Sequence, residues 1–286
     1  MDEKKNVKTI KQMGNSLPVG LLPRPEWKFL PKDNSFKFRE WGFEQEQQIA
    51  KLKNTEKSIG RFASQVLDMM LLELGGVNWE KLGEQRVLVM NQMFMADMLH
   101  LYICLRIESI GHEFALSNLR CTSCGHEHKE FVVDLRDLDV DCLSSDEKPD
   151  QKFVYILKKP ITYVHKNADG QDVEEKIESF KIGRSKWTTM EEITGEAMSN
   201  AAMTKKCILK GAIVGFNDSE GYVDADRMIG SMKKIDFELI DRFISQKNLG
   251  ATIVVEDDCK NCGKKINKAV NWSYDYFFGA SSLPLS

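Results

Sequence analysis

Apolar residues recur every three or four positions in two long stretches of the amino-terminal half. This spacing predicts a helical region over residues 44–110, because it gives each helix one apolar face to bury. The first buried stripe covers residues 59–74 and is expected to end at Gly75-Gly76; the second helix is predicted over about residues 83–107. The stripes consist of Ile59, Phe62, Ala63, Val66, Leu67, Met70, Leu71 and Leu74, and of Val87, Met90, Phe94, Met98, Leu101 and Leu105.

Residues 1–43 lack this periodicity and are predicted to form an extended arm. Proline has no backbone N–H and interrupts helices, and this segment contains four prolines. Large apolar side chains are costly to leave in water, so the arm is expected to cover either its own subunit or a neighbouring one. The residues concerned are Pro18, Pro23, Pro25 and Pro31, with Leu21, Leu22, Trp27, Phe29 and Leu30 among them.

Two further segments, residues 111–144 and 250–286, each read as a strand, a tight turn and a second strand. Because both turns carry the same cysteine pattern, we expect the segments to form one β domain that is split in the sequence. The predicted strands are residues 114–120 and 131–135 around the first turn, and residues 252–255 and 269–278 around the second, the last with an aromatic end.

Residues 145–249 lie between these halves and are predicted to be an inserted region with strands followed by helices. A polar loop over residues 142–151 precedes a β-meander over residues 151–184, in which Asp169-Gly170 is a hairpin signal. Thr188 and Glu191 have the spacing of a capping box at a helix start.

A later helix is expected to be capped by Asp236 and to end before Gly250. The whole pattern predicts an α+β fold, with amino-terminal helices and a split zinc-ribbon pair of hairpins that flanks the inserted meander and helices.

The strongest chemical signal is a repeated Cys-x-x-Cys-Gly motif, at Cys121 and Cys124 and again at Cys259 and Cys262. Two cysteines separated by two residues can direct both sulfurs at one ion, and four thiolates favour tetrahedral zinc. The glycine after each pair permits the left-handed backbone of a tight turn. We therefore predict one structural Zn²⁺ per chain, although 134 residues (125 to 258) separate the motifs.

Other interpretations of the motif have less support. A catalytic zinc usually keeps an open position, which four cysteines close. A redox pair would be expected to open a helix after a strand, and neither motif does so. His126 and His128 could replace a cysteine ligand, but their alternation is more typical of an exposed strand. Iron is a less expected occupant than zinc for isolated thiolate motifs.

Composition narrows the class of protein. The chain has 286 residues, a net charge of −3 and seven cysteines, an odd number that fits a reducing compartment better than a disulfide framework. No apolar run reaches the roughly 20 residues that a membrane span needs, and the charged start lacks a secretory signal. We expect a protein made in the cytoplasm without a membrane span.

Motifs that would indicate an enzyme are missing from the sequence. It contains no glycine-rich phosphate loop, no Gly-x-Ser-x-Gly and no His-Glu-x-x-His. The alternating acidic residues from Asp134 to Asp141 are more typical of a solvated strand face than of a cation site. The sequence predicts a protein without catalytic activity.

The order of motifs resembles a family of baseplate hub and hub-assembly proteins of contractile-tailed bacteriophages. The matching features are Leu17-Pro18 with Leu21-Leu22-Pro23, then Glu44-Gln45-Glu46, the first Cys-x-x-Cys with Val133-Asp134-Leu135, and the second Cys-x-x-Cys with Tyr276-Phe277-Phe278. This order spans most of the chain.

The resemblance implies a non-enzymatic structural or assembly protein of the tail baseplate, located in the virion. Its partners would be other baseplate and tail proteins, with a homo-oligomer also open. Only Cys121, Cys124, Cys259 and Cys262 carry over as functional residues. The helical stretch over about residues 185–250 departs from the simplest family pattern.

The alternative is a zinc-ribbon module that binds nucleic acid or acts in transcription. Lysines around the second motif would then contact phosphates. Acidic residues flank the same turns, and no aromatic residues alternate with the lysines as single-strand binding requires, so nucleic acid is the less favoured partner. The lysines are Lys129, Lys260, Lys264, Lys265 and Lys268, and the acidic residues are Glu127, Glu130, Asp257 and Asp258.

Overall fold

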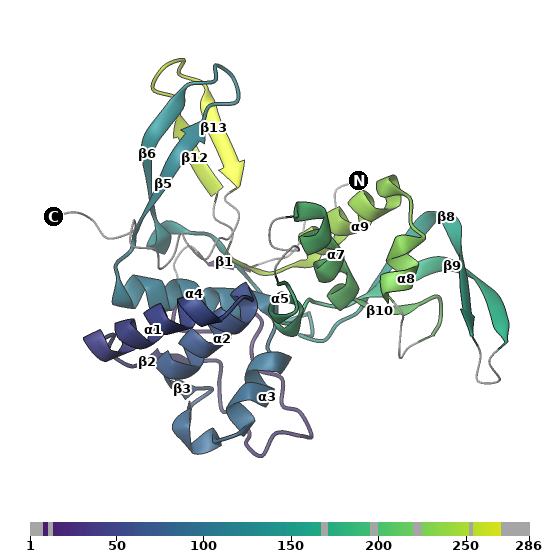
Figure 1. Ribbon diagram of the computed structural model, residues 1–286, viewed down its shortest axis with the longest axis horizontal. Coiled ribbons are helices and arrows are strands. Elements are labelled where there is room, and N and C mark those ends of the chain that lie inside the picture. Colours follow the sequence, from purple (N-terminus) through teal and green to yellow (C-terminus); the bar gives the residue numbers. More distant parts are fainter. Residues whose placement is uncertain are drawn as a thin grey trace.

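The protein has an α+β fold, as the sequence predicts. The computed structural model describes residues 8–10, 14–166, 171–194, 200–219, 225–251 and 254–269. Figure 1 shows a helical body, two β-hairpins that project from it, and a mixed region of strands and helices to one side. Two hydrophobic cores underlie this arrangement, one shared by the body and the hairpins and one inside the mixed region.

The helical body combines four helices with a small antiparallel sheet. Ser58 caps the second helix, because its side chain accepts a hydrogen bond from the backbone N–H of Arg61. The elements are α1 (Phe43–Thr55), α2 (Ile59–Met70), a short 3₁₀ turn η1 (Glu80–Leu82), α3 (Gln85–Gln92) and α4 (Met95–Ser109), with β2 (Phe36–Phe38), β3 (Leu71–Leu74) and β4 (Val77–Asn78) in the order β2-β3-β4.

The predicted helix over residues 59–74 is too long by one turn. The helix ends at Met70, and Leu71–Leu74 is strand β3, which pairs with Phe36–Phe38 of the arm. Leu71 and Leu74 are fully buried in the strand. Their burial therefore fits the helical pattern, while the strand partner, more than 30 residues away, determines the backbone.

The predicted helix over residues 83–107 is also wrong, because it is two helices. Met93 and Phe94 have extended backbones between α3 and α4. There the chain exchanges hydrogen bonds with a distant segment: Trp187 N donates to Met93 O at 2.9 Å, and Met95 N donates to Ser185 O at 2.9 Å. Val87, placed on the buried face by the sequence pattern, is 64% exposed.

The described part of the arm packs on its own subunit, which was one of the two expected arrangements. Leu17, Val19, Trp27 and Phe36 are buried. The fully buried carboxylate of Asp97 on α4 accepts hydrogen bonds from Val19 N at 2.7 Å and from Gly20 N at 3.2 Å. This contact fixes the arm to the helical body.

Each hairpin begins with a strand where the sequence predicts one, but its second strand starts earlier than predicted, at Glu127 instead of residue 131 and at Lys265 instead of residue 269. The first is β5 (Glu113–Arg120) with β6 (Glu127–Asp134), followed by the 3₁₀ turn η2 (Leu135–Asp137). The second is β12 (Val254–Asp258) with β13 (Lys265–Ala269). Thr252, Ile253 and the predicted stretch beyond Ala269 lie outside the described residues.

A three-stranded sheet joins the ends of the inserted region. Its order is β1 (Lys8–Ile10), β7 (Val140–Cys142) and β11 (Gly250–Ala251), all antiparallel neighbours. Because β7 precedes the insertion and β11 follows it, this pairing places the end of the inserted region next to its beginning. The second hairpin then starts close to the first.

Among its described residues, the inserted region builds its own core from a sheet and three of its helices, α7, α8 and α9. The sheet has the order β10-β9-β8, and the predicted Asp-Gly turn between β8 and β9 lies outside the described residues. The elements are β8 (Phe153–Lys166), β9 (Asp172–Ile182), α5 (Thr188–Glu191), α7 (Ala201–Ala212), β10 (Ile213–Phe216), α8 (Ala225–Gly230) and α9 (Lys234–Lys247).

Two predicted helix caps are wrong. Thr188 lies inside α5, whose N-cap is Trp187, and Glu191 points to another helix instead of closing a capping box. Asp236 lies in the first turn of α9, which starts at Lys234. In both cases a residue of a type that often caps helices lies within the helix. Tertiary contacts, not the local motif, determine where the helix begins.

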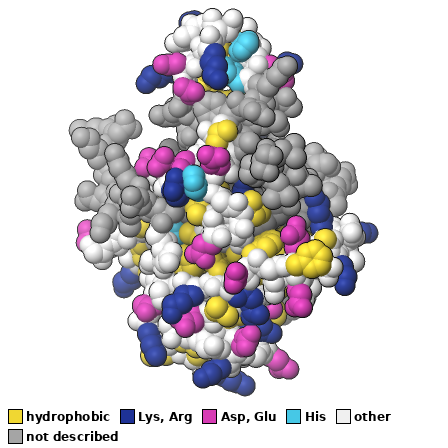
Figure 2. Space-filling model, turned by 90° about the vertical axis from the view of Figure 1, so that its left-hand side faces the viewer, with side chains coloured by type: hydrophobic (Ala, Val, Ile, Leu, Met, Phe, Trp, Pro, Cys, Tyr) yellow, Lys and Arg dark blue, Asp and Glu magenta, His cyan; other side chains and the backbone are white. Residues whose placement is uncertain are grey.

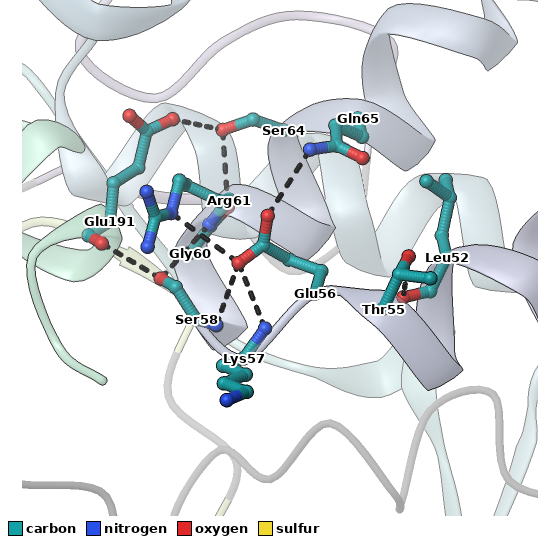
Figure 3. A network of polar contacts seen from close by, with 10 residues as sticks. All are labelled: Leu52, Thr55, Glu56, Lys57, Ser58, Gly60, Arg61, Ser64, Gln65 and Glu191. Atoms are coloured by element: carbon teal, nitrogen blue, oxygen red, sulfur yellow. Dashed lines mark hydrogen bonds and ion pairs between the residues drawn. The ribbon is translucent and has the colours of Figure 1, made fainter. Parts of the chain in front are cut away.

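The short helix α5 attaches the insertion to the helical body. Figure 3 shows Glu191 beside α2: its backbone oxygen accepts from Ser58 Oγ at 2.8 Å, and its carboxylate accepts from Ser64 Oγ. A Cβ on Gly60 would lie 2.3 Å from the backbone carbon of Met190, so only glycine allows this approach. On the other side, a Cβ on Gly211 of α7 would collide with Thr189.

Replacing Gly60 by Ala should lower the free energy of unfolding by about 1–3 kcal/mol, because the methyl group meets backbone that cannot rotate away. Gly230→Ala is the matched control, since a Cβ there meets no atom within 4 Å; we expect no loss of stability. Urea unfolding of both variants measures the difference. Equal stability of Gly60→Ala and the native chain would contradict the close approach.

The buried Asp97 should make stability depend on pH. Burial raises the pKa of Asp97 from 3.8 to about 7, against the opposing effect of the Val19 and Gly20 N–H groups. Between these two values the folded protein holds a proton that the unfolded chain releases, so stability falls as pH rises through this window. As pH rises through this range, the free energy of unfolding of the native protein should fall more steeply than that of Asp97→Asn, which has no carboxyl group to titrate. Parallel pH profiles for the two proteins would argue against this assignment.

Candidate metal centre

The structure brings the four predicted cysteines together. Cys121 and Cys124 lie in the turn between β5 and β6, and Cys259 and Cys262 lie in the turn between β12 and β13. Their sulfurs all lie within 4.8 Å of one another, and among the described residues these four form the group able to hold a metal ion.

Both turns have the same backbone geometry. In the first, Gly125 N donates to Cys121 O at 2.9 Å and Cys121 N donates to His126 O at 2.9 Å. In the second, Gly263 N donates to Cys259 O at 2.8 Å and Cys259 N donates to Lys264 O at 2.9 Å. Gly125 and Gly263 have φ angles of 73° and 66°, which explains the glycine in each motif.

The sulfur spacing fits a tetrahedral metal site. Cys121 Sγ lies 3.8 Å from Cys262 Sγ, and Cys124 Sγ lies 3.7 Å from Cys259 Sγ. Tetrahedral coordination with metal–sulfur bonds of about 2.3 Å requires sulfur–sulfur edges of about 3.8 Å. These separations are too long for disulfides, whose bonds are about 2.05 Å, and the cysteines are free.

Burial divides the ligands into two kinds. Cys121 and Cys259, the first cysteine of each motif, are buried, whereas Cys124 and Cys262 are exposed. Leu119 and Ile266 of the hairpin strands are buried with the first pair in the main core. One side of the site therefore rests on packed side chains, and the other side forms the tip of the hairpins.

Hydrogen bonds favour the thiolate form at part of the site. Backbone N–H groups of Cys124 and Ser123 lower the pKa of Cys121. The His126 N–H and the Asn261 side chain lower the pKa of Cys124 to about 6. At Cys262 the Lys264 N–H also acts to lower the pKa, but local desolvation and the neighbouring cysteine sulfurs raise it to about 11. Four thiolates at this spacing repel one another, and a bound cation offsets that repulsion.

Asn261 is a residue of the site that the sequence pattern did not single out. Its Nδ2 donates to Cys124 Sγ of the other hairpin at 3.7 Å. A donor of this kind supports a thiolate ligand and helps to hold its direction. The available sequence signal was its position between the two cysteines of the second motif.

The two histidines near the first motif do not join the group of four sulfurs. His126 is exposed, but His128 is only 6% exposed, so the prediction of an exposed strand is wrong at that residue. Their rings contact each other edge to face at 4.9 Å. His128 instead lies in β6, where it is paired with Leu119 of β5.

A second constellation on α4 has the groups of a nucleophilic site but not its environment. Cys104 Sγ lies 3.6 Å from His100 Nε2, which also lies 2.9 Å from Gly14 O, and Asp97 shares this helix face. All three side chains are buried, and burial raises the pKa of Cys104 to about 12. The thiol is therefore protonated at neutral pH, and the cluster serves to hold the arm.

A hollow of about 220 Å³ lies where the insertion meets the helical body. Buried Arg184 and Ser185 line it, and their Nε and Oγ atoms have no hydrogen-bond partner among the described residues. Both atoms are covered by protein, so they cannot contact a ligand in the open space. Arg184 is instead held by Glu147, at 2.8 Å, and by the ring of Phe153.

Charges of both signs surround the metal site. Figure 2 shows basic, acidic and histidine side chains mixed on the tip of the hairpins. Lys260, Lys264 and Lys265 are exposed there, and so are Asp257 and Asp258. This tip is not a continuous basic surface of the kind that neutralises a phosphate backbone.

Comparison of the chain with protein-family models, with curated proteins and with solved structures gave no match in any of the three. Within the described residues, no helix combines the length and apolar character that crossing a bilayer requires. What the protein does must therefore be inferred from its own residues.

Replacing Cys262 by Ser should remove the metal, because one thiolate of the tetrahedral set is lost. We expect metal content to fall from about one ion per chain to near zero. The melting temperature should fall with the metal content. Binding of a structural zinc ion releases about 10–16 kcal/mol, and this free energy contributes to the stability of the folded state. Cys207→Ser on α7 is the control and should keep its metal. Elemental analysis with thermal unfolding tests this; unchanged values for Cys262→Ser would refute the four-sulfur site.

Proposed function

We propose that this protein is a non-enzymatic structural or assembly subunit of a contractile phage tail baseplate, in which a structural zinc ion clamps the fold. The observation that carries the proposal is the convergence of four cysteine sulfurs from two distant hairpins. Such a set leaves no open coordination position, which favours a structural ion over a catalytic one.

Zinc is the proposed ion because of the donor set. Four sulfurs at tetrahedral spacing suit zinc or iron, and a mononuclear site in isolated hairpin turns favours zinc, which has no redox chemistry to control. The ion would join residues 121–124 to residues 259–262. It would thereby stabilise the return of the chain after the inserted region.

The assignment to a baseplate rests on the order of motifs that resembles the hub and hub-assembly family. One feature of the described residues supports a structural role. The buried carboxylate of Asp97 binds backbone N–H groups of the amino-terminal arm and so holds the fold together.

The nucleic-acid alternative predicts a different behaviour. A module that contacts phosphates through the tip lysines would bind nucleic acid with a steep dependence on salt. The carboxylates among those lysines oppose this binding. Absence of binding at low salt would exclude the alternative, whereas salt-dependent binding would favour it over the baseplate.

The decisive experiment is quantitative peptide mass spectrometry on purified phage particles and on the particle-free lysate. We expect a low, fixed copy number relative to the major tail protein if the subunit stays in the baseplate. A protein found only in assembly intermediates would be an assembly factor. Its absence from both particles and intermediates would refute the tail function, and zinc at one ion per chain in the purified protein tests the metal separately.

A further inference from the structure

Strand β8 leaves one edge open. The sheet order is β10-β9-β8, and no described strand pairs with the outer edge of this 14-residue strand. Val154 and Ile156 on its outer face are 58% and 75% exposed. The template to which another strand can add is therefore residues 153–156, which precede the irregular pairing and Pro160, a residue without a backbone N–H.

This edge is basic. The sequence from Gln151 to Lys166 contains no aspartate or glutamate. Lys158 and Lys159 are exposed where the pairing with β9 becomes irregular, between Ile156 and Ile161. Neither lysine forms an ion pair with a described residue. In chain direction, β8 therefore presents apolar residues and then two unneutralised positive charges.

Strand β12 has the complementary order. Its sequence is Val254-Val-Glu-Asp-Asp258, apolar and then acidic. Within the described part of the chain, β13 is the one strand that pairs with it. Asp257 and Asp258 are exposed and form no ion pair there.

We propose that the β8 edge of one copy of this chain binds the β12 edge of a second copy. Figure 1 shows β8 and β12 on separate projections of the molecule, so they cannot meet within one copy. Parallel alignment would place the start of β12 beside the apolar part of β8 and the aspartates beside Lys158 and Lys159.

The proposed contact joins two different surfaces. Two copies can exchange both contacts and close a dimer, or the contact can repeat from copy to copy in a larger ring or a filament. A five-residue strand such as β12 spans only about 17 Å, so the association is weak and depends on charge. It concerns copies of this chain and does not require the tail function.

Sedimentation of the full chain tests the proposal. The average mass should exceed the 32.7 kDa of one chain and rise with concentration. It should return to one chain near 1 M salt, where the Debye length is about 3 Å. Lys158→Glu with Lys159→Glu, and separately Asp257→Lys with Asp258→Lys, should each remain monomeric, because both edges then carry the same sign.

Mixing the two charge-reversed variants should restore association, since every β8 edge then finds a β12 edge of opposite charge. Lys233→Glu with Lys234→Glu is the matched control: it changes the net charge equally at exposed residues near the start of α9 and should associate as the native chain does. A monomeric native chain at every concentration, or a mixture that stays monomeric, would overturn the proposal.

Because Asp257 and Asp258 precede a metal ligand, metal content must be checked in that variant. If the aspartate variant loses metal, zero-length cross-linking of the native protein tests the proposed contact instead. A carbodiimide should join Lys158 or Lys159 to Asp257 or Asp258, and a mixture of isotope-labelled and unlabelled copies should show that the link is between chains. Links confined to one chain, or none at these residues, would overturn the proposal.

Discussion

Four cysteine sulfurs that repel one another as thiolates must share a volume less than 5 Å across, and the rest of the fold is arranged to bring them there. The two motifs are 134 residues apart (125 to 258). Pairing of β7 with β11 places the end of the inserted region next to its beginning, so that the second hairpin begins beside the first. The ion proposed for this site would offset the repulsion and add a cross-link to a loop whose closure costs entropy.

Close backbone packing supplies the second constraint. The insertion has its own core, yet it is attached to the helical body through one helical turn, α5, held between Gly60 of α2 and Gly211 of α7. The same region interrupts the helical body, since Ser185 and Trp187 hydrogen-bond to the break between α3 and α4. Body and insertion are therefore parts of one packed structure, in which a change at the junction affects both cores.

Buried polar groups connect distant segments of the chain. Asp97 on α4 binds backbone of the arm, and Arg106 on the same helix donates to Glu113 O of the first hairpin, 2.9 Å away. These hydrogen bonds satisfy buried polar groups and fix the arm and the hairpin to the helical body.

The sequence by itself determined the features that depend on local spacing. The Cys-x-x-Cys-Gly motifs specified two similar turns, because sulfur direction and glycine φ are set within five residues, and the strand pattern around the first turn indicated β5 and part of β6. Only the tertiary structure decided where helices end. Leu71–Leu74 and Met93-Phe94 carry helical apolar patterns, yet distant strand partners took their backbone hydrogen bonds. Thr188 and Asp236 match cap motifs but lie inside helices. Gly60 gave no sequence signal, since its role depends on backbone 130 residues away.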